Sequence, residues 1–261
     1  MENVVDHLSQ LTAGCKGKRV LITGGTGFTG QWLAVMAEAL GAHVTSIGLD
    51  LTRQDLPAGV IAPDLPPELK ARHIMCDIRN FDDLADHVAR ARPQIILHLA
   101  AQPLVLESFA TPYETLSSNA TGTLNVIEAG VRANASQILT ITSDKVYRNN
   151  DTGRAMQEGD AMQGSDPYSS AKAPAEASLA GYAQAVLCQG PPRAVARAGN
   201  IIGGGDWSAD RLVPDFVRAI ATGTSITIRN PDATRPWQHV LDACAGYLLF
   251  SAGLGTGDFK S

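Results

Sequence analysis

The sequence lacks the features that mark several large classes of protein. Even its longest apolar stretches, such as residues 95–101 with His98 inside, are far too short to cross a bilayer. A basic excess is also missing, because 21 Lys and Arg stand against 26 Asp and Glu, a formal net charge of −5. A dedicated binder of nucleic acid or of an anionic membrane would show clustered basic residues. We therefore expect no nucleic-acid partner and no membrane partner.

Two further absences concern the cellular compartment. The first six residues have neither a basic start nor an apolar core, so no secretory signal is visible. The cysteines are scattered, with no CxxC pair: Cys15, Cys76, Cys188 and Cys244. Reduced thiols in a cytoplasmic protein are the simplest interpretation, and no metal site is expected.

What the sequence does contain is an alternation of apolar runs and helical segments. Residues 19–23, 43–48, 72–77, 94–101, 137–143 and 193–197 are predicted strands, and residues 32–40, 81–92, 119–133 and 168–186 are predicted helices. Parallel strands need helical crossovers, so this order predicts an α/β fold with a doubly wound parallel Rossmann sheet. The first eighteen residues are predicted as a polar lead-in, and loops are expected after Gly199.

A glycine-rich turn follows the first predicted strand. Gly24, Gly25, Gly27 and Gly30 satisfy both GxxGxxG and GxGxxG, between a predicted strand and a predicted helix. Such glycines allow a tight turn and let a pyrophosphate approach a helix N-terminus, whose free N–H groups attract anions. The turn therefore indicates a dinucleotide site, the alternative being a turn that serves packing alone.

The choice of dinucleotide depends on Asp50, twenty residues after Gly30 at the end of the second predicted strand. A carboxylate there accepts from the ribose hydroxyls and repels a 2′-phosphate, which favours NAD over NADP. Arg53 argues the other way, and Asp50 can also be interpreted as a solvated loop acid. After the third strand, Asp77 and Ile78 fit either an adenine-contacting position or a surface turn.

The remaining cofactor candidates lie near strand ends and on the helices that follow. A corner of small residues after the fourth predicted strand leaves room for a dinucleotide to pass. The full set of cofactor candidates is Gly24, Gly27, Phe28, Thr29, Gly30, Asp50, Asp77, Ile78, Ala100, Ala101, Gln102, Asn119, Tyr168 and Lys172.

The candidate catalytic residues fall into two groups. Tyr168 and Lys172 are spaced i, i+4, which places them on one face of a helix that Asp166 can cap and Pro167 can begin. A nearby ammonium stabilises phenolate, so the pair can act as a base, although YxxxK also occurs by chance. Ser143, Asp144 and Lys145 follow a buried strand, where α/β sheets bind ligands; a solvated turn is the alternative.

These motifs resemble the extended short-chain dehydrogenase/reductase family of nucleotide-sugar enzymes and, within it, the CDP-glucose 4,6-dehydratases. The similarity runs from about residue 19 to residue 249. The segments that carry it are HLAAQPLV (98–105), TSDKVY (142–147), DPYSSAK (166–172), RAGNIIGGGDW (197–207), DRLVP (210–214) and NPDATRPWQHV (230–240). The last three are far more specific than the glycine loop.

The resemblance implies a reaction. Tyr168 would take the proton of the sugar 4-hydroxyl while NAD takes the C4 hydride. Asp144 would protonate the departing 6-hydroxyl, and Lys145 would remove the C5 proton where the similar dTDP-glucose dehydratases have a glutamate. The hydride then returns to C6, which gives a 4-keto-6-deoxy sugar. Lys145 can act as a base only if the site depresses its pKa.

The resemblance also implies a domain organisation. Residues 16–198 form the NAD-binding Rossmann domain, and residues 199–261 form a small, shortened substrate-binding lobe with some segments returning to the first domain. The candidates for a nucleotide-sugar, whose diphosphate suits guanidinium groups, are Asn200, Arg211, Arg235, Gln238 and His239. Arg235 can equally be a solvated loop charge. A homodimer, formed through the helix ending near Ala133 and the Tyr168 helix, is expected by analogy.

Two features depart from the family pattern and keep other functions open. Pro174 lies inside the catalytic helix, where its missing N–H costs roughly 3 kcal/mol and a kink would displace Lys172. The substrate lobe is also expected to be short and to leave the site open to water. A nucleotide-sugar 4-epimerase, which needs no acid–base pair for elimination, and a catalytically reduced NAD-binding protein are therefore the alternatives to a dehydratase.

Overall fold

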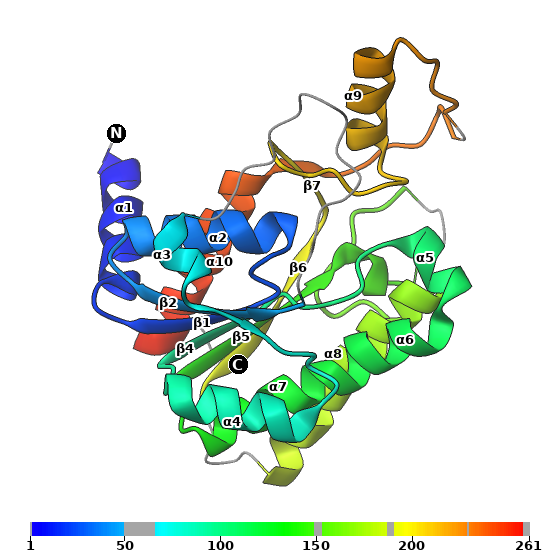
Figure 1. The fold of residues 1–261 in the computed structure, drawn as a ribbon. Coiled ribbons are helices and arrows are strands. Elements are labelled where there is room, and N and C mark those ends of the chain that lie inside the picture. The colour runs from blue at the N-terminus through cyan, green and yellow to red at the C-terminus, as the bar shows by residue number, and fades with distance from the viewer. Residues whose placement is uncertain (1, 50–65, 149–152, 187–190, 229, 258–261) are drawn as a thin grey trace.

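A computed structural model describes residues 2–49, 66–148, 153–186, 191–228 and 230–257 (Figure 1). The strands are β1 (Arg19–Thr23), β2 (His43–Gly48), β3 (His73–Met75), β4 (Ile95–His98), β5 (Gln137–Ser143), β6 (Arg193–Ala198), β7 (Asn200–Ile202) and β8 (Trp237–His239). The helices are α1 (Glu2–Cys15), α2 (Phe28–Ala39), α3 (Pro67–Lys70), α4 (Phe81–Ala91), α5 (Val105–Ala110), α6 (Pro112–Leu116), α7 (Gly122–Arg132), α8 (Pro167–Val186), α9 (Leu212–Thr222) and α10 (Val240–Thr256). A π-helical turn, Ser117–Thr121, joins α6 to α7, and a 3₁₀ turn, Asp144–Val146, follows β5.

The first six strands form one parallel sheet in the order β3-β2-β1-β4-β5-β6. The order reverses beside β1, which is the switch point where open α/β sheets bind ligands. Successive residues of β1 alternate between the two faces: Val20 and Ile22 join one apolar core, and Leu21 joins the other. The predicted doubly wound parallel sheet is confirmed.

Helices cover both faces of this sheet, as Figure 1 shows. On one face α1, α2 and α10 pack together, and on the other α4 packs against α7. The prediction of a polar lead-in is wrong: residues 2–15 form α1, which buries Leu11 and Cys15 against the core. The expectation of loops after Gly199 is wrong in part, because this region contains α9 and α10.

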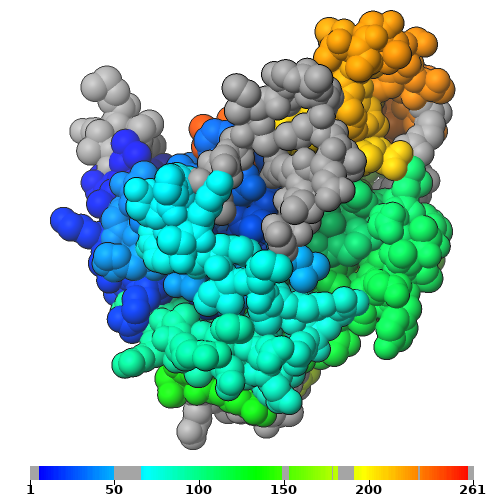
Figure 2. Space-filling model, viewed as in Figure 1, coloured from blue at the N-terminus to red at the C-terminus, as the bar shows by residue number. Residues whose placement is uncertain are grey.

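The second half of the chain divides between a projecting segment and the main body. β7 and β8 form a separate two-stranded parallel sheet that pairs Asn200 with Trp237. The α9 segment projects from the main body (orange in Figure 2), whereas α10 returns to pack on α1 and α2. Within the described ranges, every helix is too short or too polar to traverse a bilayer.

Candidate active site

The turn between β1 and α2 packs closely against the backbone that follows β4 and against the first turn of α2. Gly24 has φ +75, and a Cβ at this position would lie 2.7 Å from the backbone nitrogen of Ala100 at the end of β4. A Cβ on Gly30 would collide with the Gly24 carbonyl oxygen. Gly27 precedes α2 in extended conformation, and no side chain caps that N-terminus. The first N–H groups of α2 are therefore free to bind a pyrophosphate, so the turn fits a dinucleotide.

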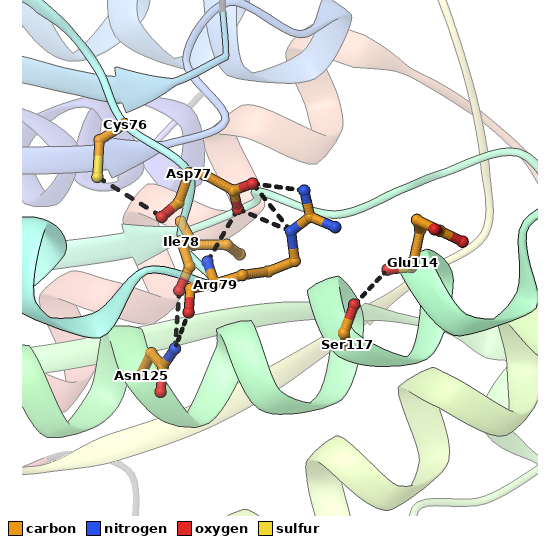
Figure 3. A network of polar contacts seen from close by, with 7 residues as sticks. All are labelled: Cys76, Asp77, Ile78, Arg79, Glu114, Ser117 and Asn125. Carbon is orange, nitrogen blue, oxygen red and sulfur yellow. Dashed lines mark hydrogen bonds and ion pairs between the residues drawn. The ribbon is translucent and has the colours of Figure 1, made fainter.

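The segment after β3 is fixed by its own charges (Figure 3). Asp77 accepts from the Nε and Nη2 atoms of Arg79, with the shortest contact at 2.6 Å. This fork from Arg79 holds the pKa of Asp77 below its usual range, against the opposing effect of burial. The Asn125 side chain on α7 donates to the carbonyls of Ile78 and Arg79, at 2.9 and 3.3 Å. Asp77 is therefore a fixed carboxylate at the carboxyl end of the sheet, suited to bind an adenine amino group.

Ile78 and Asp50 are both predicted to contact the cofactor, and the structure describes only Ile78. The Ile78 side chain is buried against α7, where a Cβ on Gly122 would lie 2.7 Å from its Cδ1 atom. Its side chain is thus part of the core, which leaves its backbone for any cofactor contact. Asp50 and Arg53 lie outside the described residues.

The corner after β4 is held by buried amides. The Asn119 side chain accepts from the Gln102 N–H at 2.8 Å and donates to the Gln102 carbonyl at 3.0 Å. Asn119 lies in the π-helical turn and is fully buried. Its amide is thus committed to shaping the corner formed by Ala100, Ala101 and Gln102. Phe28, at the start of α2, lies near Gly203, while the Thr29 carbonyl accepts from the Cys244 thiol at 3.8 Å.

The predicted pair on α8 is buried and regular. Asp166 caps the helix, because its carboxylate accepts from the Ser169 N–H at 2.9 Å and from the Ser169 hydroxyl at 2.6 Å. Tyr168 and Lys172 are 9% and 5% exposed. Pro174 is exposed and the helix continues through it to Val186. Since both residues precede Pro174, the proline does not separate them.

Burial acts on the protonation of both groups. It raises the pKa of Tyr168; a hydrogen bond with Ser143 and the positive charge of Arg211 oppose this, while Asp144 and Asp166 reinforce it. Burial lowers the pKa of Lys172 to about 8, and the Glu176 carboxylate opposes that shift. The Lys172 ammonium also donates to the Ile141 carbonyl at 3.4 Å. A buried phenol and a buried ammonium thus lie one helical turn apart on α8, and an ammonium so placed favours a phenolate.

An acidic and a basic side chain follow directly after β5. The Ser143 hydroxyl donates to the Asp144 carboxylate at 3.1 Å and accepts from the Lys145 N–H at 3.2 Å. The Lys145 ammonium lies 3.7 Å from the same carboxylate, and the two side chains are 38% and 33% exposed. Ser143 therefore connects a buried phenol to a solvent-accessible acid–base pair, the set of groups that an elimination requires.

The predicted substrate residues come from the second half of the chain. Asn200 on β7 has a buried Oδ1 atom with no hydrogen-bond partner among the described residues, which marks it as an acceptor for a ligand. Arg211 pairs with the buried Asp206 at 3.0 Å and is close enough to Tyr168 to influence its pKa. The register of β7 on β8 places Gln238 beside Ile201 and His239 beside Ile202.

The other second-half candidates have weaker geometric support. The His239 Nδ1 atom accepts from the Leu241 N–H at 3.2 Å and so caps α10. The Arg235 side chain is exposed, and its guanidinium donates to the neighbouring Thr234 carbonyl at 2.8 Å. Trp207, which follows Asp206, has a buried indole N–H without a hydrogen-bond partner among the described residues. Asn200, Arg211 and Trp207 are therefore better placed to meet a ligand than Arg235 or His239.

The sequence interpretation overlooked two charged residues beside the pair. Glu176, one turn beyond Lys172, is buried and forms an ion pair of 2.6 Å with Arg197 at the end of β6. The spacing of four residues from Lys172 was the available signal for Glu176. Arg197 is separated from it by 21 positions, so only the fold brings the two together.

Comparison with known proteins agrees with this geometry. A CDP-glucose 4,6-dehydratase of Salmonella typhimurium is 38% identical over 94% of this chain and 69% of its own length. A UDP-glucose 4-epimerase of Rickettsia rickettsii is 25% identical over 87% of this chain and 60% of its own. The solved dTDP-glucose 4,6-dehydratase DesIV of Streptomyces venezuelae, with NAD and TYD bound, has a TM-score of 0.76 at 26% identity and covers 90% of this chain and 72% of that one.

The match extends to the family as a whole. The description "NAD dependent epimerase/dehydratase family" fits residues 20–257, which include the glycine turn, the α8 pair and both sheets. The α2 N-terminus and the close approach of Gly24 to Ala100 suit the cofactor that this description names. The chain belongs to the NAD dependent epimerase/dehydratase family.

Proposed function

We propose that the protein is a nucleotide-sugar 4,6-dehydratase that converts CDP-glucose to CDP-4-keto-6-deoxyglucose. The observation that carries this proposal is the placement of Ser143 between the buried Tyr168 and the exposed Asp144–Lys145 pair. An epimerase needs only the tyrosine and the lysine, whereas loss of water also needs an acid and a base. The CDP-glucose 4,6-dehydratase among the relatives supports the choice of substrate.

The reaction begins when the site residues bind the nucleotide-sugar and remove the proton of its 4-hydroxyl. Burial raises the pKa of Tyr168, and the Ser143 hydrogen bond and the charge of Arg211 oppose that rise. Together with Lys172 one helical turn away, these groups favour the phenolate, which takes the proton of the sugar 4-hydroxyl. NAD, held by the glycine turn and the α2 N-terminus, supplies hydride acceptance and return when bound. Arg211 binds the diphosphate side of the substrate, where a guanidinium matches phosphate oxygens, and the Asn200 Oδ1 atom accepts from an N–H or hydroxyl group of the substrate.

The second duty is elimination. Once C4 is a ketone, the C5 proton is acidic, and Lys145 removes it. Asp144 donates a proton to the departing 6-hydroxyl, which leaves as water. For Lys145 to act as a base it must first lose its proton, and the neighbouring Asp144 carboxylate is the nearest acceptor, 3.7 Å away. Lys145 returns the C5 proton to C5 as the 6-methyl group forms. The proton that Tyr168 took from the 4-hydroxyl passes through Ser143 to Asp144 and replaces the one that left with water, so the turnover loses one water and no net proton.

Product analysis tests the proposal. Purified protein is incubated with NAD and CDP-glucose, and the nucleotide-sugar is weighed by mass spectrometry. A product lighter by one water supports the dehydratase. A hexose isomer of unchanged mass would support the 4-epimerase, and NAD binding without turnover would support a catalytically reduced protein. Parallel incubations with dTDP-glucose and UDP-glucose identify the preferred base.

We further propose that the enzyme works as a homodimer in the cytoplasm. Residues 16–198 form the NAD-binding domain and residues 199–261 form the substrate-binding lobe, apart from α10, which returns to pack on α1 and α2. Support for the dimer comes from α5 and α6, which contact α8 and expose four large apolar side chains: Leu106, Phe109, Tyr113 and Leu116. Apolar groups gathered on one surface favour association with a second copy. The described cysteines, Cys15, Cys76 and Cys244, are free thiols, which supports the cytoplasmic location.

A further inference from the structure

Three residues of α8 lie along one face at intervals of four. Tyr168, Lys172 and Glu176 are all buried, and Glu176 is 6% exposed. The first two form the proposed catalytic pair. The hydrogen bonds of Glu176 run to Thr142 and Arg197, so these neighbours are the route by which it can act on the reaction.

The Glu176 carboxylate is held from two strands. The Thr142 hydroxyl on β5 donates to its Oε1 atom. The Arg197 guanidinium on β6 donates to Oε2 through Nη2 at 2.6 Å and through Nε at 2.9 Å. This fork fixes the position of the carboxylate and compensates its burial.

Arg197 extends the network to the segment after β5. It donates to the Tyr147 hydroxyl at 2.7 Å, and its guanidinium carbon lies 4.7 Å from the centroid of the Tyr147 ring. It also donates to the Glu158 carbonyl at 3.1 Å. The segment that carries Asp144 and Lys145 is thereby tied to the same carboxylate.

Consecutive residues of β5 link Glu176 to the catalytic pair. Ile141 accepts from the Lys172 ammonium, Thr142 donates to Glu176, and Ser143 bonds the Tyr168 phenol. A displacement of the Glu176 carboxylate would therefore move the end of β5, to which both Tyr168 and Lys172 are hydrogen-bonded.

The charge of Glu176 is a second link between this residue and the catalytic pair. The groups that face Lys172 are His98 from β4 and Glu176 from α8, with Arg197 from β6 behind Glu176. Tyr168 precedes Lys172 by one turn on the same face of α8. Burial lowers the pKa of His98 to about 3, so this ring is neutral at physiological pH. Those that face Tyr168 are Ser143, Asp144, Asp166, Arg211 and Tyr247. Glu176 is therefore the anion that stabilises the Lys172 ammonium.

We propose that Glu176 is a positioning residue for the Tyr168–Lys172 pair: its carboxylate, fixed by Arg197 and Thr142, keeps Lys172 charged and aligns the end of β5. The inference rests on the proposed function, because it assigns Tyr168 the role of base. It predicts an effect on the ionisation of Tyr168 that can be measured without any turnover.

The test replaces Glu176 by Gln, which keeps the shape and removes the charge. The phenol of Tyr168 is titrated by ultraviolet absorbance in NAD-loaded protein, as the difference from a Tyr168→Phe variant. In Glu176→Gln the Lys172 ammonium is less stable, so we expect the Tyr168 pKa to rise by about one unit, a tenfold loss of phenolate. An unchanged Tyr168 titration would overturn the inference even if the enzyme were active.

Kinetics gives an independent reading. With CDP-glucose, Glu176→Gln should lower kcat on the order of tenfold with little change in KM, and the alkaline fall in kcat should move to lower pH. A merely structural residue would lower the melting temperature and leave the pH profile of the remaining activity in place. If the wild-type protein turns over no nucleotide-sugar, the proposed function fails, while the phenol titration still decides the role of Glu176.

Matched variants control for folding. Glu38→Gln removes a carboxylate that binds Arg72 at 2.7 Å far from α8, and it should leave the titration unchanged. Should Glu176→Gln fail to fold because Arg197 is left unpaired, the double variant Glu176→Gln with Arg197→Gln removes both charges. It should show the same rise in the Tyr168 pKa, and a wild-type value in the double variant would overturn the proposal. Glu176→Asp, which restores the charge, should recover most of kcat.

Discussion

At the level of single residues, the acid role proposed for Asp144 is what distinguishes a dehydratase from an epimerase. Asp144→Asn keeps the hydrogen-bonding shape beside Ser143 and removes the acidic proton. We expect dehydration to fall on the order of a hundredfold or more, the usual contribution of a general acid, with unchanged affinity for NAD. Product formation and NAD titration measure the two effects.

The control for this variant is an exposed aspartate on α4, Asp82→Asn, which should leave both quantities unchanged. Dehydration at the wild-type rate in Asp144→Asn would contradict the acid role.

Lys172 links activity and stability through its pKa of about 8, lowered from 10.5 mainly by burial. Burying the charged Lys172 lowers the free energy of unfolding, and this destabilisation is complete below pH 8, where the lysine is protonated in both states. Between pH 8 and 10.5 the folded protein loses the proton while the unfolded chain keeps it, so the destabilisation is relieved as pH rises. Lys172→Met should therefore increase the free energy of unfolding at pH 7 on the order of 2 kcal/mol while activity is lost. Denaturant unfolding at several pH values measures this.

The gain in Lys172→Met should shrink as pH rises above 8, since the wild-type lysine then becomes neutral in the folded state. A variant less stable than wild type at pH 7 would contradict the assignment of a strained, buried ammonium.

Residues of the site differ in how visible they are in the sequence. Tyr168 and Lys172 were predicted because helical periodicity alone places them on one face. The fork of Arg79 on Asp77 and the amide pair of Asn119 with Gln102 depend on side-chain orientation, which no spacing encodes. A role for Glu176 could not be predicted from the sequence, because its partners Arg197 and Thr142 come from other elements.

The helix α8 carries a proline that its function does not require. Pro174 removes the N–H that would donate to the Ser170 carbonyl, while the helix continues to Val186. Pro174→Ala should restore that bond and stabilise the fold by about 1–3 kcal/mol, with kcat within twofold of wild type because the catalytic pair precedes the proline. Thermal unfolding and steady-state kinetics measure the two quantities.

Pro112→Ala is the matched control, since Pro112 occupies the first turn of α6, where proline is favourable, and this variant should gain nothing. A Pro174→Ala variant that is less stable than wild type would show that the proline is required by its surroundings.

The helices and strands also differ in how well they can be predicted from the sequence. β1, β4 and β5 were predicted because strands buried on both faces are continuously apolar. The helix α10 was overlooked because it is apolar nearly all round and so has no polar stripe to mark its period. The helix α1 was overlooked for the opposite reason, since most of its described residues are exposed and only Leu11 and Cys15 are buried.

At the scale of the whole molecule, the proposed homodimer is tested at the exposed apolar surface of α5 and α6. Phe109 is 60% exposed. Phe109→Asp should therefore weaken the proposed dimer at least tenfold, because a carboxylate would be buried in the interface. Analytical ultracentrifugation measures the dissociation constant.

Phe216→Asp on α9 provides a comparable control, because Phe216 is 51% exposed on an element that projects from the main body. An equal loss of dimer in both variants would place the interface elsewhere, and a wild-type monomer at all concentrations would contradict the dimer itself.

The central claim is that one site removes a hydride from C4, eliminates water, and returns the hydride to C6. CDP-glucose carrying deuterium at C4 tests this directly when the nucleotide-sugar product is examined by nuclear magnetic resonance and mass spectrometry. We predict a product lighter by one water with the deuterium in its C6 methyl group. Deuterium retained at C4 in a sugar of unchanged mass would contradict the account.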